Sequence, residues 1–295
     1  MPFAGQPGIS PVVGLVLAAL SVVILGVAKS GFGGGVGILA VPLFALALGA
    51  QNGTALLLPF LLAADSFSVY HHWGTWDAGI LKVLAPGTLV GILIGSVCLY
   101  LLVHLPGDGS PTAAAATTAS APATKTPTAQ KQSEKALDLL TGVVSVGYVV
   151  LDQIRRRYAP NWHFKANHRS GAVAGAAVGT VSSISHAAGP IAAIFLLGQG
   201  LPRQTFIGTT VIYFFAVNAI KLIPFTLIGM YNWKQLAAAP WFLLVLVPLG
   251  TFLGAWMNRK ISDAAFRTTI MLLVLLSGLD LITSTFGYNV LSLFH

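Results

Sequence analysis

The residue of this sequence with the clearest chemical potential is Lys221, which lies inside the apolar run FFAVNAIKLIP. With helical spacing it shares one stripe with three upstream residues, Thr210, Phe214 and Asn218. Pro224 is expected to kink this helix one turn later. A lysine within a membrane span is costly unless an opposite charge compensates it. The stripe therefore predicts either an anion site or a structural ion pair with Asp65 or Asp280.

The stretch GTVSSISHAAGP, residues 179–190, holds the second chemical feature. Four polar side chains crowd the end of one apolar segment: Ser182, Ser183, Ser185 and His186. Gly189 and Pro190 open the next segment, and a helix that begins there points its free N–H groups and positive dipole end into the protein. With Lys221, these groups predict a site for a small anion. The alternatives are a structural histidine and serines that bond only to their own backbone.

The stretch KSGFGGGVGILAVP, residues 29–42, places Lys29 and Ser30 directly before a glycine run, Gly33, Gly34 and Gly35. Each glycine costs about 1 kcal/mol in a helix relative to alanine, so the chain is expected to unwind here. Irregular backbone at membrane depth lies buried in protein or lines a cavity, as in the broken helices of transporters. We expect this break to supply Lys29 as a second cation. The alternative is a surface of small residues for close helix packing.

Asp65 is a further candidate, as an ion-pair partner or as the group that couples substrate movement to protons, a role also open to His186. His71 and His72 stand beside tryptophans, which fits an interfacial aromatic belt better than a metal site. A hydrolase set of Ser183, His186 and Asp65 is conceivable, but no nucleophile motif accompanies it. We expect no catalytic residue, no metal and no cofactor.

The composition excludes a soluble domain, since 55% of the 295 residues are hydrophobic and 8% are charged. The net charge of +8 does not indicate a nucleic-acid partner, because the basic residues lie in short loops between apolar segments. The single Cys98 cannot form an intrachain disulfide. The partners expected are a small anion and the lipid bilayer.

Apolar segments are expected at 9–28, 36–48, 53–70, 79–103, 136–154, 170–186, 189–199, 206–229, 236–257 and 264–286. The segments at 36–48 and 189–199 are shorter than the roughly 20 residues of a spanning helix, so they either span or re-enter. The Ala, Thr, Pro and Ser-rich stretch 104–135 reads as a flexible loop, and 155–169 as a basic loop. The first repeat then comprises 1–103 and 136–154, and the second comprises 170–295.

Internal similarity supports this division. Gly53-Thr54 and Gly208-Thr209 are each followed 21 residues after the first glycine by another glycine. Glycine pairs with a four-residue spacing come next, Gly91/Gly95 and Gly250/Gly254. Each copy holds five segments, an odd number, so the second copy is expected to be inserted upside down. The sequence thus predicts an all-α integral membrane protein, a polytopic helical bundle of two inverted repeats with broken or re-entrant helices.

These motifs resemble those of the TauE/SafE sulfite exporter family of anion permeases. The resemblance rests on KSGFGGGVGILAVP, on the twice-occurring GT…G pattern, and on SISHAAGP followed by GTTVIYFFAVNAIKLIP. It covers nearly the whole chain except 104–135 and the tail. It implies two repeats and a link to export or uptake of sulfite, sulfoacetate or other organosulfonates. AAGP stands where many members carry GGP, and this lost glycine is expected to tighten the second break.

The function expected is transport of a small oxyanion across the cytoplasmic (inner) membrane of a bacterium, coupled to an ion gradient. The residues expected to bind the anion are Lys29, Ser30, Gly33, Gly34, Gly35, Ser182, Ser183, His186, Gly189, Asn218 and Lys221. Asp65 or His186 would be the titratable group that couples transport to the ion gradient. A passive anion channel is the main alternative, and an intramembrane enzyme is the other. The oligomeric state is left open.

The charge distribution predicts that both termini face the cell exterior and that residues 155–169 face the cytoplasm. In a Cys98→Ser background, Asn161→Cys should resist an impermeant thiol reagent in intact cells, and Ala119→Cys in the long loop should react. Labelling of the Asn161→Cys protein in intact cells would contradict the predicted inversion.

Overall fold

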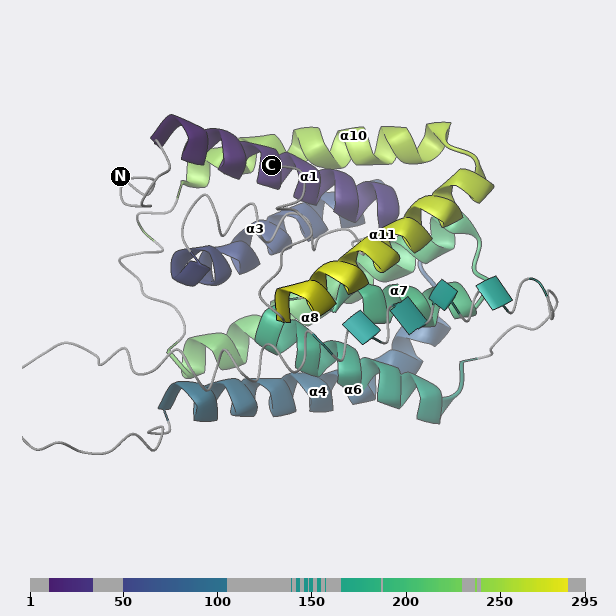
Figure 1. Cartoon of the computed structure of the whole chain (residues 1–295), viewed down its shortest axis with the longest axis horizontal. Helices are drawn as coiled ribbons and strands as arrows, with labels where there is room; N and C mark the ends of the chain where they lie inside the picture. Colours follow the sequence, from purple (N-terminus) through teal and green to yellow (C-terminus); the bar gives the residue numbers. More distant parts are fainter. Residues whose placement is uncertain are drawn as a thin grey trace, which may run out of the picture.

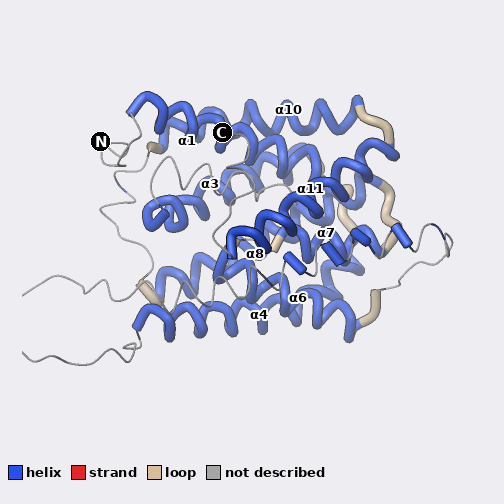
Figure 2. Tube along the Cα trace, viewed as in Figure 1, coloured by secondary structure: helices blue, strands red, loops and turns tan. Residues whose placement is uncertain are grey.

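The computed structural model of the chain describes residues 11–33, 50–104, 166–186, 188–229 and 240–285, with isolated residues between 139 and 157 and at 237. These ranges contain helices and no strands (Figures 1 and 2). The elements are α1 (Pro11–Phe32), α3 (Ala50–His71), α4 (Ala78–His104), α6 (His168–Ser185), α7 (Gly189–Gly198), α8 (Arg203–Leu227), the 3-10 turn η2 (Trp241–Val245), α10 (Leu246–Lys260) and α11 (Asp263–Thr285).

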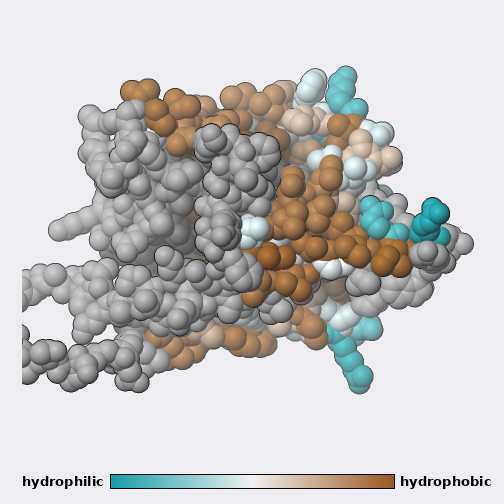
Figure 3. All heavy atoms as spheres, viewed as in Figure 1, coloured by the Kyte–Doolittle hydropathy of each residue, from teal (hydrophilic) through white to brown (hydrophobic). Residues whose placement is uncertain are grey.

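Four of the described helical stretches are long and apolar enough to cross a membrane, namely those at Val12–Phe32, Ala78–Leu101, Arg203–Leu227 and Trp241–Lys260. Large apolar side chains cover much of the outer surface, where lipid replaces water (Figure 3). The prediction of an all-α membrane protein with several spans is confirmed.

One boundary was predicted wrongly. The first helix does not end at residue 28 but continues through Lys29 and Ser30 to Phe32, and Gly33 then takes a left-handed conformation with φ of 69°. Glycine adopts this conformation without a steric penalty, so the chain can turn there. Gly34, Gly35, the segment 36–48 and most of 104–165 lie outside the described residues.

Two helix pairs pack through glycines at backbone contact. Between α4 and α6, a methyl group added at Gly91 would clash with the backbone of Ala176. Between α1 and α10, a methyl group at Gly26 would lie 2.7 Å from the Thr251 nitrogen. Small residues let helix backbones approach closely, and such seams are typical of membrane helices. The glycine spacing predicted as a repeat signature therefore marks two packing seams.

The glycine contacts also fix the helix directions. Along α1 and α10, Gly26 faces Gly250 and Gly31 faces Gly254, so these helices run parallel. Along α4 and α6, Gly87 meets Ala172 and Gly91 meets Ala176, so these helices are parallel as well. Helix α3 runs antiparallel to α8, as Figure 1 shows. Helices with matching sequence in the two halves thus run in opposite directions: α1 and α6, α3 and α8, α4 and α10.

One end of the bundle, which we call the basic end, is where α1, α3 and α10 finish and α4, α6 and α8 begin (Figure 1). Its described residues include exposed or half-buried basic side chains: Lys82, Arg169, Arg203, Arg259 and Lys260. Hydrophilic surface gathers there in Figure 3. The basic residues assigned to one side of the membrane by charge counting therefore lie at one end of the structure.

Helices α6 and α7 form a helical hairpin. The residue just before the cap of α6, Ala166, donates its backbone N–H to Gln199 Oε1 at 2.7 Å, directly after α7. The hairpin thus enters and leaves at the basic end. Because α7 has 10 residues, it rises about 15 Å, half of a hydrocarbon core of roughly 30 Å. Helix α7 alone is therefore too short to cross a membrane.

The packing seams can be tested by adding a single methyl group. We expect Gly91→Ala to lower the stability of the purified protein by about 1–3 kcal/mol, because the new methyl overpacks against α6. Gly147→Ala is the matched control, since no described atom lies within 4 Å of a methyl group there. Thermal unfolding in detergent measures both variants. A Gly91→Ala protein as stable as the control would contradict backbone contact at this seam.

Candidate functional site

The buried face of α8 carries the predicted stripe. Thr210, Phe214, Asn218 and Lys221 are all buried, with Lys221 fully enclosed at 0% exposure. Helix α8 continues for only three residues beyond Pro224, to Leu227. The prediction that these residues share a buried face is confirmed.

The ammonium of Lys221 has three hydrogen-bond acceptors around it. Nζ lies 3.0 Å from the Ser182 carbonyl oxygen, 2.9 Å from Ser182 Oγ and 3.1 Å from His186 Nδ1. An ammonium group has three N–H bonds, so each acceptor takes one. All three acceptors are neutral, and no described carboxylate bonds to Lys221. The alternative in which Lys221 pairs directly with Asp65 is therefore wrong, and the side chain of Asp280 lies outside the described set.

His186 reaches Lys221 because it occupies the turn that ends α6. Its φ of 56° and ψ of 10° are left-handed, which is uncommon for a residue with a side chain. Two residues later Ala188 caps α7, whose second position is Pro190. When protonated Lys221 donates to Nδ1, the imidazole carries its own proton on Nε2. That N–H and the first N–H groups of α7 are further donors at the break.

A second charged cluster lies one turn away along α8. Lys29 Nζ forms an ion pair with Asp65 Oδ1 at 2.7 Å, and Asn218 Nδ2 donates to Asp65 Oδ2 at 2.7 Å. The ammonium of Lys29 also lies 4.9 Å from the centre of the Phe214 ring, a favourable cation–π distance. Lys29 is 3% exposed and Asp65 is 0% exposed. The ion pair thus joins two residues of the first half, and Asn218 and Phe214 of α8 contact it from the second half.

The other predicted residues are placed less directly. Ser30 and Ser183 are buried, and their hydroxyls have no hydrogen-bond partner among the described residues. At Gly33 an added methyl group would lie 3.0 Å from Thr210 Cβ, so the end of α1 touches the α8 stripe. Gly189 is buried as the first residue of α7. Gly34 and Gly35 cannot be placed, because they lie outside the described ranges.

Two polar residues that hold the end of α1 were missed. His72 Nε2 lies 2.8 Å from the Ser30 carbonyl oxygen, and Asn258 Nδ2 donates to the Gly31 carbonyl at 3.0 Å. The last carbonyls of a helix lack partners within the helix, so buried ones need outside donors. The sequence did contain a signal for these contacts, because His72 and Asn258 are polar residues beside the ends of apolar segments. His72 is thus structural, and the described residues contain no group of three metal-ligating side chains.

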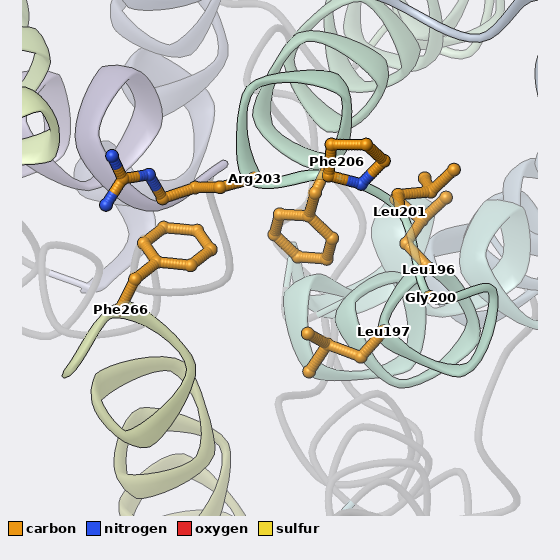
Figure 4. Close-up of a pocket in the computed structure, with 8 residues that line it drawn as sticks. Leu196, Leu197, Gly200, Leu201, Arg203, Phe206 and Phe266 are labelled. Atoms are coloured by element: carbon orange, nitrogen blue, oxygen red, sulfur yellow. The ribbon is translucent and has the colours of Figure 1, made fainter. Parts of the chain in front are cut away.

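A cavity of about 210 Å³ lies at the basic end, away from both clusters. Its lining residues come from the end of α7, the following turn, and the starts of α8 and α11 (Figure 4): Leu196, Leu197, Gly200, Leu201, Pro202, Arg203, Phe206 and Phe266. The guanidinium of Arg203 lies 5.8 Å from the centre of the Phe266 ring and donates to the Ile261 carbonyl. The cavity is largely apolar, and Arg203 ties α8 to the start of α11.

Comparison with known proteins agrees with this architecture. The model of the family described as sulfite exporter TauE/SafE matches residues 18–281. Neither the curated proteins nor the solved structures give a match. The matched range contains both buried charged clusters and nearly all of the described helices. The chain therefore belongs to the TauE/SafE sulfite exporter family.

Proposed function

We propose that this protein moves a small oxyanion, sulfite or an organosulfonate, across the cytoplasmic membrane of a bacterium, coupled to an ion gradient. The observation that carries the proposal is Lys221, an enclosed ammonium held by neutral groups at a helix break. A buried charge without a counterion is costly in a membrane. An anion at this place supplies the missing charge.

The anion is coordinated by Lys221 together with the donors that surround the break. His186 Nε2–H and the first N–H groups of α7 are the nearest candidates, and the helix dipole favours negative charge there. Ser183 contributes a buried hydroxyl with no described partner. This set contains only donors for an oxyanion, which suits three or more oxygens with negative charge.

Two groups are candidates for coupling, Asp65 and His186. Asp65 is fully enclosed and bonded to Lys29 and Asn218, so gaining a proton breaks an ion pair next to the anion site. His186 contacts Lys221 directly. The two halves are inverted repeats in this proposal, supported by the opposite directions of matching helices. Alternating access then arises from movement of one half against the other.

A passive anion channel would need the same site but no coupling. Uphill accumulation of an anion in proteoliposomes, driven by an imposed proton gradient, separates a coupled transporter from a channel. A hydrolase is disfavoured by the geometry, because His186 Nδ1 lies against Lys221 and Asp65 bonds Lys29 and Asn218. Ser183 Oγ bonds to neither among the described contacts.

The role of Lys221 can be tested by removing its charge. Lys221→Gln keeps a polar group of similar length, so we expect the fold to survive. Anion affinity should fall by the contribution of a charge-assisted hydrogen bond, roughly 1.5–3 kcal/mol or about 10- to 150-fold. The measurement is the ligand-induced rise in unfolding temperature with sulfite, sulfoacetate and taurine, since a bound ligand stabilises the folded state by mass action.

Lys82→Gln is the matched control, because Lys82 is an exposed lysine at the basic end. This variant should bind anions like the wild-type protein. Equal ligand-induced stabilisation in Lys221→Gln and Lys82→Gln would exclude Lys221 from the site.

A further inference from the structure

The buried charges of the two clusters can be counted. Among the described residues, two lysines and one aspartate are buried: Lys29, Lys221 and Asp65. The described lysines and arginines at the basic end are exposed or half-buried. With both lysines protonated and Asp65 ionised, these three side chains carry two positive charges and one negative charge.

The two lysines differ in how their charge is balanced. Lys29 meets Asp65 at 2.7 Å, and Asn218 occupies the second carboxylate oxygen, so this cluster is neutral as a unit. Lys221 is held by a carbonyl oxygen, a hydroxyl and an imidazole nitrogen, none of which is charged. The excess of one positive charge is thus located on Lys221.

We infer that the site selects anions by charge number and binds singly charged anions in preference to doubly charged anions of the same shape. This inference rests on the proposed function. A monoanion beside Lys221 brings the described interior to neutrality, whereas a dianion leaves one uncompensated negative charge in a medium of low dielectric constant. The ligands it favours are organosulfonates with no second charged group, hydrogensulfite and small monocarboxylates. Doubly charged sulfate is disfavoured.

Asp65 acts here as a specificity-determining residue that does not touch the anion. Both its oxygens are already occupied by Lys29 and Asn218. Its negative charge cancels Lys29 and thereby leaves one positive charge for the ligand. Replacing Asp65 by a neutral residue raises the excess of positive charge to two, which matches the charge of a dianion.

Methanesulfonate and sulfate are suitable probes, because they are similar in size and differ by one charge. The full-length protein in detergent is titrated with each anion, and affinities are obtained from the rise in unfolding temperature. In the wild-type protein, methanesulfonate should bind at least tenfold more tightly than sulfate. In Asp65→Asn, the ratio of methanesulfonate affinity to sulfate affinity should fall at least tenfold. In Lys29→Gln/Asp65→Asn, where the excess is again one, the wild-type ratio should return.

Lys29→Gln provides a measurement that does not depend on the folding of Asp65→Asn. With Asp65 retained, the excess falls to zero, and both anions should bind at least tenfold more weakly although Lys221 is unchanged. The double variant then controls for loss of the lysine itself, because it should recover methanesulfonate binding.

The outcomes separate this inference from the proposed function. Sulfate binding as tight as methanesulfonate binding in the wild-type protein, with loss of both in Lys221→Gln, overturns the charge-number inference and leaves the anion site intact. An unchanged ratio in a folded Asp65→Asn protein also overturns it. Absence of binding by either anion in the wild-type protein overturns both proposals.

Discussion

The burial of a lysine charge at Lys221 is the constraint on which the rest of the site depends. Three neutral acceptors satisfy its three N–H bonds, so the cost of lost hydrogen bonding is avoided while the cost of the charge remains. Two of these acceptors belong to Ser182 and the third to His186, at the end of α6. The position of the charge is therefore determined by where α6 stops.

The end of α6 is in turn held in place by the packing of the hairpin. Glycines along α6 bring its backbone against α4, and Thr180 Oγ1 donates across that seam to the Gly91 carbonyl at 3.2 Å. Gln199 closes the hairpin at the basic end through Ala166. Helix α8 is fixed from the other side, where Asn218 bonds Asp65 of α3. Lys221 thus lies between two elements, each held by its own contacts.

The sequence predicted the parts of this site that depend on local rules. A buried stripe on α8 follows from helical spacing, and the start of α7 at Gly189 follows from a proline in its first turn. The extension of α1 to Phe32 was missed, because its glycines were judged by helix propensity alone. Gly26 and Gly31 pack against the backbone of α10, and that close approach outweighs about 1 kcal/mol of propensity per glycine. Choosing Lys29 over Lys221 as the partner of Asp65 requires the three-dimensional placement of α1, which spacing along the chain does not contain.

The two clusters hold charge in the apolar interior in different ways. An ion pair that is also hydrogen-bonded to Asn218 needs no ligand, since each charge already has its partner. A lone ammonium with neutral acceptors keeps its geometry without a ligand but has the stronger attraction for one, because an anion adds a charge–charge attraction that a neutral acceptor does not supply. In the proposed function, an anion that arrives at Lys221 exchanges for a neutral acceptor and does not compete with a carboxylate. Were Asp65 bonded to Lys221 instead, every anion would first have to displace an internal carboxylate, and a weakly basic oxyanion such as a sulfonate is poorly suited to that exchange.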